Sequence, residues 1–236
     1  MVLDEQAKYT ALDAWFKTPQ GRRVAEAFAS ELQGVDGALS GRRLLQLGAC
    51  GDNIWLPTLR FRQKWLVSPS ISAQTATIYS SVYALPIERN SVDCVLAPLT
   101  MEACSRHRNP IDEIDRILKP MGYVVFLGIN PWSFWGLALR YGKVSCFDHA
   151  SVTLRSSLTL KLALLNRGYR QCLLSSFYYI PPVEHETWIH KLEFLNEMGK
   201  MIWPYPASFY CFIAQKYDPC LVMPQAEQSD LYLVRA

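Results

Sequence analysis

The sequence lacks the cysteine spacing that binds zinc or builds a disulfide framework. Its seven cysteines are scattered, and no two of them form a Cys-x-x-Cys pair. Several stand inside apolar runs, where a thiol behaves as a small hydrophobic group. His185 and His190 are too far apart along a predicted helix to share one face as metal ligands. These absences argue against a disulfide-rich secreted protein, and we predict no metal site.

Long apolar runs and a strong charge of one sign are also missing. No stretch approaches the run of about 18 uncharged apolar residues that crosses a bilayer. The first six residues lack the basic and apolar regions of a secretory signal. The net charge is +3 and the pI is about 8.4, which is too weakly basic to predict a nucleic-acid partner. We expect no membrane span, and a reduced cytoplasmic compartment.

The composition is that of a globular protein. Half of the 236 residues are hydrophobic and 19% are charged, and this length suits one α/β domain with a sizeable buried core. We divide the chain into an N-terminal helical cover (1–40), a central domain (41–216) and a C-terminal tail (217–236). The tail shows no clear hydrophobic period.

Strand-like and helical segments alternate through the first half of the chain, and this order predicts a parallel sheet covered by helices on both faces. Apolar runs predict strands at 43–47, 64–69, 77–79, 92–97 and 123–129, and later at 171–180 and 208–216. Helical patterns occur at 5–33 (with a break at Thr18-Pro19), 54–59, 71–77, 109–118, 137–141, 151–166 and 183–203.

The helical segment that begins at Pro19 carries Val24, Phe28 and Leu32 at helical spacing. A helix ahead of the first strand either closes over a binding site or covers one edge of the sheet. We favour the edge position.

The first predicted strand ends in a turn that contains Gly48 and Gly51. Nucleotides bind α/β folds at such turns, because glycine lets the backbone approach a ligand and amides at the following helix start face it. A structural turn is the alternative, since the chain has no Gly-x-Gly-x-x-Gly motif here.

Three segments together resemble the class I S-adenosylmethionine-dependent methyltransferases of the type 11 group. They are Leu44–Gly48, Leu85–Leu96 and Asp112–Val125, and the last contains the Leu-Lys-Pro-x-Gly turn before an apolar strand. The loop 130–133 and the Trp-Pro pair at 203–204 further resemble a small proteobacterial subgroup of methyltransferases. The resemblance implies a Rossmann-like seven-stranded sheet, mostly parallel, with the last strand antiparallel between its neighbours.

The resemblance also implies S-adenosyl-L-methionine as cofactor. The family holds it with a glycine-rich turn and with acidic residues at the ends of the first three strands. This chain has Gln46, Ser68 and Ser81 at or near those acidic positions. Three such exchanges would weaken binding by about a hundredfold if each costs about 1 kcal/mol. The implied cofactor-binding set is Gln46, Gly48, Ala49, Cys50, Gly51, Ser68, Ser81 and Pro98.

No residue is assigned a catalytic role. Asn130 and Trp132 follow the fifth strand at the carboxyl edge of the sheet, so we expect them either to contact substrate or to shape the loop. Glu102 stands at the acidic position after the fourth strand, and we favour a helix-surface acid over a pocket residue. We interpret His107 as part of a basic surface turn and His149 as a loop residue.

Three functions compete for this sequence. The first is a methyltransferase that acts on a small molecule with a degenerate cofactor loop, in which Asp52 or Glu102 restores negative charge. The second is a pseudo-methyltransferase that binds or supports a partner, and a side chain filling the space above Gly48 and Ser68 would favour it. The third, ranked last, is binding of another nucleotide such as a nicotinamide cofactor. The sequence indicates no oligomeric state.

Overall fold

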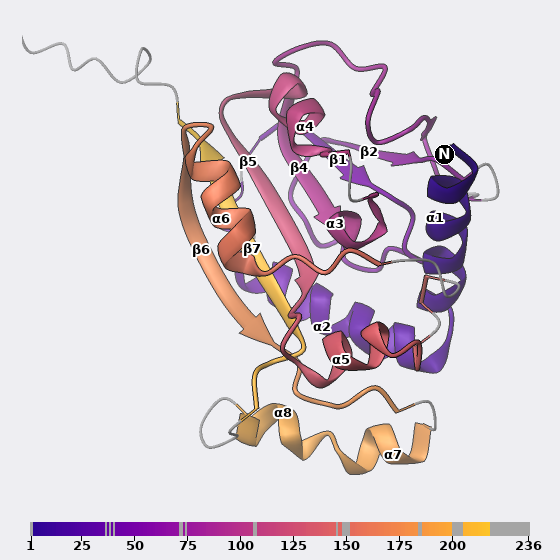
Figure 1. The fold of residues 1–236 in the computed structure, drawn as a ribbon. Helices are drawn as coiled ribbons and strands as arrows, with labels where there is room; N and C mark the ends of the chain where they lie inside the picture. The colour runs from indigo at the N-terminus through magenta and orange to yellow at the C-terminus, as the bar shows by residue number, and fades with distance from the viewer. Residues whose placement is uncertain are drawn as a thin grey trace, which may run out of the picture.

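A seven-stranded mixed sheet forms the centre of the computed structural model (Figure 1). The structure describes residues 2–35, 37, 39, 41–70, 73, 75–105, 108–144, 146–147, 152–183, 186–199 and 205–217. Its strands are β1 (Arg43–Leu47), β2 (Gln63–Ser68), β3 (Ile78–Tyr79), β4 (Val92–Pro98), β5 (Leu118–Ile129), β6 (Tyr169–Phe177) and β7 (Phe209–Lys216).

The strand order is β3-β2-β1-β4-β5-β7-β6. The pairs among the first five strands are parallel, whereas β7 runs antiparallel between β5 and β6. This topology confirms the sheet implied by the resemblance. The order of the parallel strands reverses between β1 and β4, and ligands bind outside the carboxyl ends of strands at such a switch point.

The central strands are buried along their length, as strands covered on both faces must be. Leu44, Leu45, Gln46 and Leu47 of β1 are all buried, and so is almost all of β4. A fully buried glutamine in β1 is the exception to this apolar pattern, and it marks the site described below.

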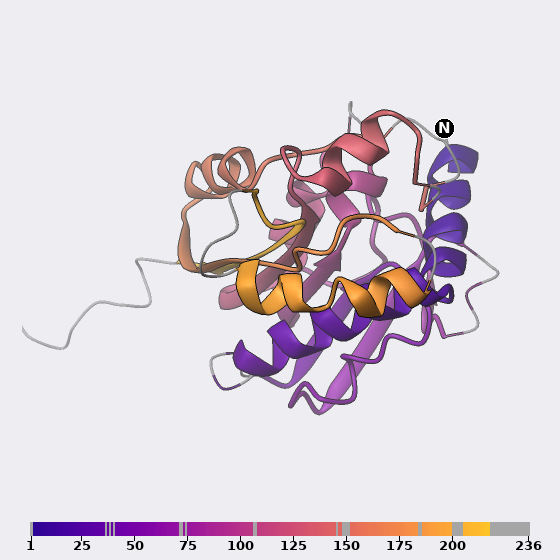
Figure 2. The same ribbon diagram turned by 90° about the horizontal axis from the view of Figure 1, so that it is seen from below.

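Helices cover both faces of this sheet. They are α1 (Val2–Phe16), α2 (Pro19–Val35), α3 (Thr100–Ala103), α4 (Ile111–Ile117), α5 (Phe134–Arg140), α6 (Ser157–Leu165), α7 (Glu186–Lys191) and α8 (Phe194–Gly199). Seen from below, α6 lies on one side of the sheet and α2 on the other (Figure 2). Among the described helices, none combines the length and apolar character needed to cross a membrane.

The predicted break at Thr18-Pro19 separates α1 from α2. The Thr18 hydroxyl accepts the Gly21 N–H at 3.1 Å, which caps the new helix. Phe28 of α2 packs edge-on against Phe177 of β6 and Phe209 of β7. The segment therefore lies on a face of the sheet, and the favoured edge position is wrong. The reason is that the ends of β6 and β7 present aromatic rings to this face. The division of the chain at residue 41 stays a prediction.

Several predicted helices differ in the structure. Residues 54–59 form turns instead of a helix, because Asn53 is left-handed (φ 48°) and Pro57 has no N–H for a helical bond. Of the helix expected at 71–77, the described residues 73 and 75–77 are not helical. The helix expected from 151 begins at 157, where the Ser156 side chain accepts the Thr159 N–H. The segment expected as one helix at 183–203 contains α7 and α8, and its residues 184–185 and 200–203 lie outside the described part.

Candidate functional site

The turn after β1 lies at the carboxyl edge of the sheet, beside β4. Its two glycines have positive φ angles, 91° at Gly48 and 59° at Gly51, which glycine adopts without a Cβ penalty. The Gly48 N–H donates to the Val67 carbonyl of β2 at 2.7 Å. The Thr100 hydroxyl of α3 reaches the Leu47 carbonyl from the β4 side at 3.2 Å. The turn is thus tied to both neighbouring strands.

Gln46 holds this turn from inside. Its amide nitrogen donates to the Gly48 carbonyl at 2.9 Å and to Asn53 Oδ1 at 2.5 Å. Its carbonyl oxygen accepts the indole N–H of Trp55 at 2.8 Å. Because these bonds engage both ends of the side-chain amide, Gln46 shapes the turn rather than presenting a free polar group to a ligand.

The other turn residues of the implied cofactor set are buried. Ala49 packs in a small cluster with Leu66. The Cys50 N–H donates to Asn53 Oδ1 at 3.1 Å, and burial raises the pKa of the Cys50 thiol well above its usual value. Asp52 is exposed, and its role in restoring negative charge near the cofactor stays a prediction.

Ser68, Ser81 and Pro98 lie at the ends of strands or just beyond them. Ser68 is fully buried at the end of β2, and its hydroxyl accepts the Ser70 N–H at 3.1 Å. Pro98 closes β4. Ser81 follows β3 and begins the loop that leads to the Leu85-Pro86 step. The structure therefore brings the predicted cofactor positions to one edge of the sheet.

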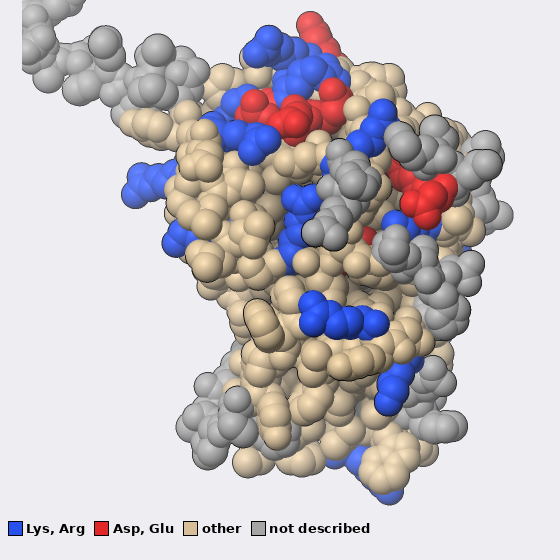
Figure 3. All heavy atoms as spheres, viewed as in Figure 1, with Lys and Arg blue, Asp and Glu red and all other residues tan. Residues whose placement is uncertain are grey.

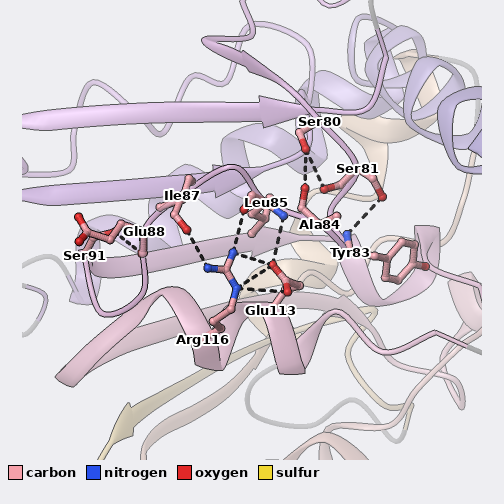
Figure 4. Close-up of polar contacts among 10 residues, drawn as sticks. All are labelled: Ser80, Ser81, Tyr83, Ala84, Leu85, Ile87, Glu88, Ser91, Glu113 and Arg116. Carbon is pink, nitrogen blue, oxygen red and sulfur yellow. Dashed lines mark hydrogen bonds and ion pairs between the residues drawn. The ribbon is translucent and has the colours of Figure 1, made fainter.

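The loop after Ser81 is fixed by α4 (Figure 4). Arg116 donates to the carbonyls of Leu85 at 2.7 Å and Ile87 at 2.8 Å. Glu113 accepts the Leu85 N–H at 3.1 Å and pairs with Arg116 at 2.9 Å. The hydrogen bond from Arg116 lowers the pKa of Glu113, so the carboxylate stays charged in this contact.

Two carboxylates from α1 reach the backbone of this site. Glu5 accepts the Val82 N–H at 3.0 Å and the Ser81 hydroxyl at 2.8 Å. Asp13 accepts the Gly51 N–H at 2.9 Å. Figure 1 shows α1 on the side of the sheet toward which the arrows of β1 and β2 point. The acids that are absent from the strand ends are thus matched in space by acids from α1.

Two further side chains of α1 complete this contact. A Cβ placed on Gly48 would lie 2.4 Å from Cε1 of Tyr9, so the tyrosine ring rests directly on the glycine. Tyr9 is fully buried, and its hydroxyl has no hydrogen-bond partner among the described residues. The hydroxyls of Thr10 and Ser70 are 2.7 Å apart. The space above Gly48 is therefore filled by a side chain.

Sequence reasoning did not single out these residues of α1. Glu5, Tyr9 and Asp13 recur at intervals of four, which puts them on one face of a helix. That face combines two acids with a tyrosine, and the structure buries all three. The spacing was a usable signal, but nothing local indicates which surface such a face contacts.

Glu102 lies in the first turn of α3, the short helix that follows the left-handed residue Leu99 (φ 49°). It is fully buried, so the favoured interpretation as a helix-surface acid is wrong. Its Oε1 accepts the Ile129 N–H at 2.9 Å, and its Oε2 has no partner among the described residues. Burial raises the pKa of Glu102 to about 7, although the Arg155 charge opposes the shift. Glu102 thus secures the end of β5.

Asn130 and Trp132 follow β5 as expected, but they differ in exposure. The Asn130 side chain donates to the Ala207 carbonyl at 3.2 Å and accepts the Trp132 N–H at 3.2 Å. These bonds give Asn130 a loop-shaping role. Trp132 is 76% exposed, so its ring is available to a ligand. His107 and His149 lie outside the described residues.

The chain is similar to known proteins over its sheet and beyond. A family model described as a methyltransferase domain matches residues 53–126. The uncharacterized protein YafS of Escherichia coli (strain K12) is 28% identical over 180 residues, which are 74% of this chain and 72% of YafS.

Solved structures share the fold at low sequence identity. A methyltransferase of Thermotoga maritima, described as S-adenosylmethionine-dependent and a possible histamine N-methyltransferase, has a TM-score of 0.63 and 19% identity, over 92% of this chain and all of that one. Geranyl diphosphate C-methyltransferase of Streptomyces coelicolor, solved with Mg²⁺, geranyl diphosphate and S-adenosyl-L-homocysteine, has a TM-score of 0.56 and 13% identity, over 83% of this chain and 80% of that one.

Proposed function

We propose that the chain is a class I S-adenosylmethionine-dependent methyltransferase that binds this cofactor and methylates a small molecule. The observation that carries the proposal is the glycine turn at the switch point between β1 and β4. There, Gly48 and Gly51 take up positive φ angles at the edge where such sheets bind ligands. The methyl group of a sulfonium is already activated, so the protein's task is to bind, align and exclude water.

The proposed cofactor groove has donors of the kind that a nucleoside requires. The backbone N–H groups of Gly51 and Val82 and the hydroxyl of Ser81 all donate to carboxylates of α1. Ring nitrogens and ribose oxygens accept hydrogen bonds from such groups. However, Tyr9 touches Gly48, so the residues do not fit the cofactor while α1 is in this position.

The proposed loop is degenerate in a specific sense. Gln46 replaces an acid, and its amide is engaged with Gly48, Asn53 and Trp55. Ser68 likewise uses its hydroxyl within the chain, as an acceptor from Ser70. We expect weaker cofactor binding than in relatives with three strand-end acids, because neutral hydrogen bonds replace charge-assisted ones.

A small-molecule acceptor is supported by the surface as well as by the relatives. The names of the two methyltransferases of known structure point to small-molecule acceptors. On the face shown in Figure 3, Lys and Arg side chains gather around acidic ones beside α4, and the other Lys and Arg side chains are separated by uncharged surface. A continuous basic face, as a polyanion would require, is not seen in this view. Trp132 offers an exposed ring at the carboxyl edge for an apolar acceptor.

Calorimetry of the full chain with S-adenosylmethionine and S-adenosylhomocysteine tests this proposal. We expect binding in the micromolar to millimolar range, and Gly48→Val should abolish it, because the new side chain enters the groove at a residue with positive φ. Gly34→Ala is the matched control, since a Cβ at Gly34 meets nothing within 4 Å. Affinity retained by Gly48→Val would place the cofactor elsewhere.

The second candidate is a pseudo-methyltransferase that supports a partner. The contact of Tyr9 with Gly48 favours it, because a side chain fills the space where a cofactor would pass. If calorimetry detects no binding at millimolar cofactor, the methyltransferase proposal fails and the pseudo-methyltransferase is favoured.

A further inference from the structure

The polar face of α1 is buried against the turn after β1 and the segment after β3, the proposed cofactor groove, instead of facing solvent. Glu5, Tyr9 and Asp13 are 6%, 0% and 9% exposed. Carboxylates are rarely buried without partners, because removal from water is costly. Here the partners are donors of the glycine turn and of the segment after β3, and Asp13 also pairs with Lys17 at 2.8 Å. The pairing is therefore between α1 and the positions that a nucleotide cofactor would use.

Each contact occupies a different part of the proposed groove. Glu5 takes the donors at Ser81 and Val82, on the side implied for the adenine. Tyr9 covers Gly48 at the centre, and Asp13 takes the donor at Gly51. A ligand that used these donors would have to replace the carboxylates one by one.

In the position that α1 has in this structure, called closed below, one polar atom of its buried face lacks a hydrogen bond. The buried Tyr9 hydroxyl has no hydrogen-bond partner among the described residues. Burial of a hydroxyl without a partner opposes the closed position, because in water the same group would be hydrogen-bonded. The charged contacts of α1 are thus those of Glu5 and Asp13, on either side of Tyr9.

We propose that α1 is an internal competitor of the cofactor: its Glu5–Tyr9–Asp13 face occupies the groove, and the cofactor binds when α1 moves away. This inference rests on the proposed function, since it concerns the same groove. It accounts for the neutral strand ends together with the buried acids of α1. The measured affinity for the cofactor is then its affinity for the molecule with α1 displaced, multiplied by the fraction of molecules in that state.

A disulfide lock tests the competition directly. The Thr10 and Ser70 hydroxyls are 2.7 Å apart, so cysteines at both positions are close enough to bond. We would prepare the full-length T10C/S70C variant, oxidise it with glutathione disulfide, and confirm the bond by mass spectrometry. Calorimetry with S-adenosylhomocysteine should show binding by the reduced form. We expect an affinity loss of about a hundredfold or more in the oxidised form, because α1 can no longer leave. Wild-type protein given the same treatment controls for the native cysteines.

A release variant tests the same idea from the other side. Glu5→Ala removes the charged acceptor at Ser81 and Val82, so we expect about tenfold tighter S-adenosylhomocysteine binding, since a charge-assisted hydrogen bond is worth about that factor. The control is Glu26→Ala on α2, whose side chain is 56% exposed, and it should bind like the wild type.

The outcomes separate the two proposals. Equal affinity of the oxidised and reduced lock would overturn the competition while leaving the cofactor site intact. Weaker binding by Glu5→Ala would also overturn it, because Glu5 would then be a cofactor ligand. If neither the wild type, the reduced lock nor Glu5→Ala binds at millimolar ligand, the proposed function itself fails and the inference fails with it.

Discussion

Glu102 is a carboxyl group kept out of water at the end of a strand. Its ordinary pKa of 4.5 is raised to about 7 by burial, while Arg155 lowers it and the Ile129 N–H stabilises the charged form. The nearby groups Cys104, Cys146 and Tyr210 are themselves buried, and burial raises their pKa values. In the folded protein Glu102 therefore keeps its proton to higher pH than in the unfolded chain.

This shift makes stability depend on pH. Between pH 4.5 and 7 the unfolded chain releases the Glu102 proton and the folded chain retains it, so the free energy of unfolding falls as pH rises. The loss attributable to this group is roughly 3 kcal/mol above pH 7. Glu102→Gln should remove that part of the pH dependence. Urea unfolding of both proteins at pH 5 and pH 7.5 measures it, with Glu26→Gln as the exposed control. An unchanged difference between the two pH values would show that Glu102 does not titrate in this window.

For single residues, the sequence showed which strand-end acids are missing, but it did not show which side chains contact the residues in their place. The neutral residues Gln46, Ser68 and Ser81 were recognisable at once against the family pattern. Their surroundings were not, because Glu5 lies 76 residues from Ser81 along the chain. Nor could periodicity show that Gln46 would bond to Trp55 rather than face a ligand.

At the scale of elements, the loop after Ser81 and helix α4 act as one unit (Figure 4). Arg116 gathers the carbonyls of Leu85 and Ile87, and Glu113 holds the Leu85 N–H. Arg116→Ala should lower the free energy of unfolding by about 1–2 kcal/mol, an estimate reduced because the side chain is 35% exposed. It should also weaken cofactor binding, since Ser81 and Val82 lose their fixed position.

Thermal unfolding and calorimetry measure these two effects. Arg167→Ala is the comparison, because Arg167 pairs with the 69% exposed Asp112 at the surface. A loss of stability equal to that of Arg167→Ala would mean that the loop does not depend on Arg116.

Strands were easier to predict than helices for a physical reason. Strands such as β1 and β4 are buried on both faces of a parallel sheet, so each appears in the sequence as a short continuous apolar run. Such a run can be recognised without knowing its neighbours in the fold. The segment 54–59 has apolar residues at helical spacing, yet Asn53 and Pro57 turn it into a series of turns. There the backbone preferences of two residues outweigh the periodicity of their neighbours.

At the scale of the whole molecule, one core joins the N-terminal helices to the sheet. Phe28 contacts Phe16, Trp55, Phe177 and Phe209, which come from four separate parts of the chain. Phe28→Ala should therefore cost about 3–5 kcal/mol, as the removal of a buried phenylalanine does. Phe194→Ala, at a residue that is 52% exposed, should cost far less.

The same contacts predict a single unfolding transition. Circular dichroism of the helices and tryptophan fluorescence should give coincident curves for the wild type, because α2 shares its packing with β6 and β7. A separate, earlier transition in helical signal would show that α2 folds independently of the sheet.

The topology was predictable only through the resemblance. Placing β7 between β5 and β6 joins residues about 90 positions apart, such as Tyr123 and Gln215. Alternating patterns indicate a parallel sheet, but they do not say that one late strand enters it in the opposite direction. The position of α1 had no such guide, because α1 precedes the first strand and lies outside the segments that carried the resemblance.

The end of α1 gives the molecule an optical probe of its own. Trp15 is 6% exposed, with its indole ring edge-on to Trp135 at 5.7 Å and its N–H bonded to Gln20. A ring in such dry surroundings emits at short wavelength, and departure of α1 would bring it into water and shift its emission to the red. Because the chain has seven tryptophans, the difference between spectra of the wild type and of Trp15→Phe can thus follow the helix as it leaves the groove without any label.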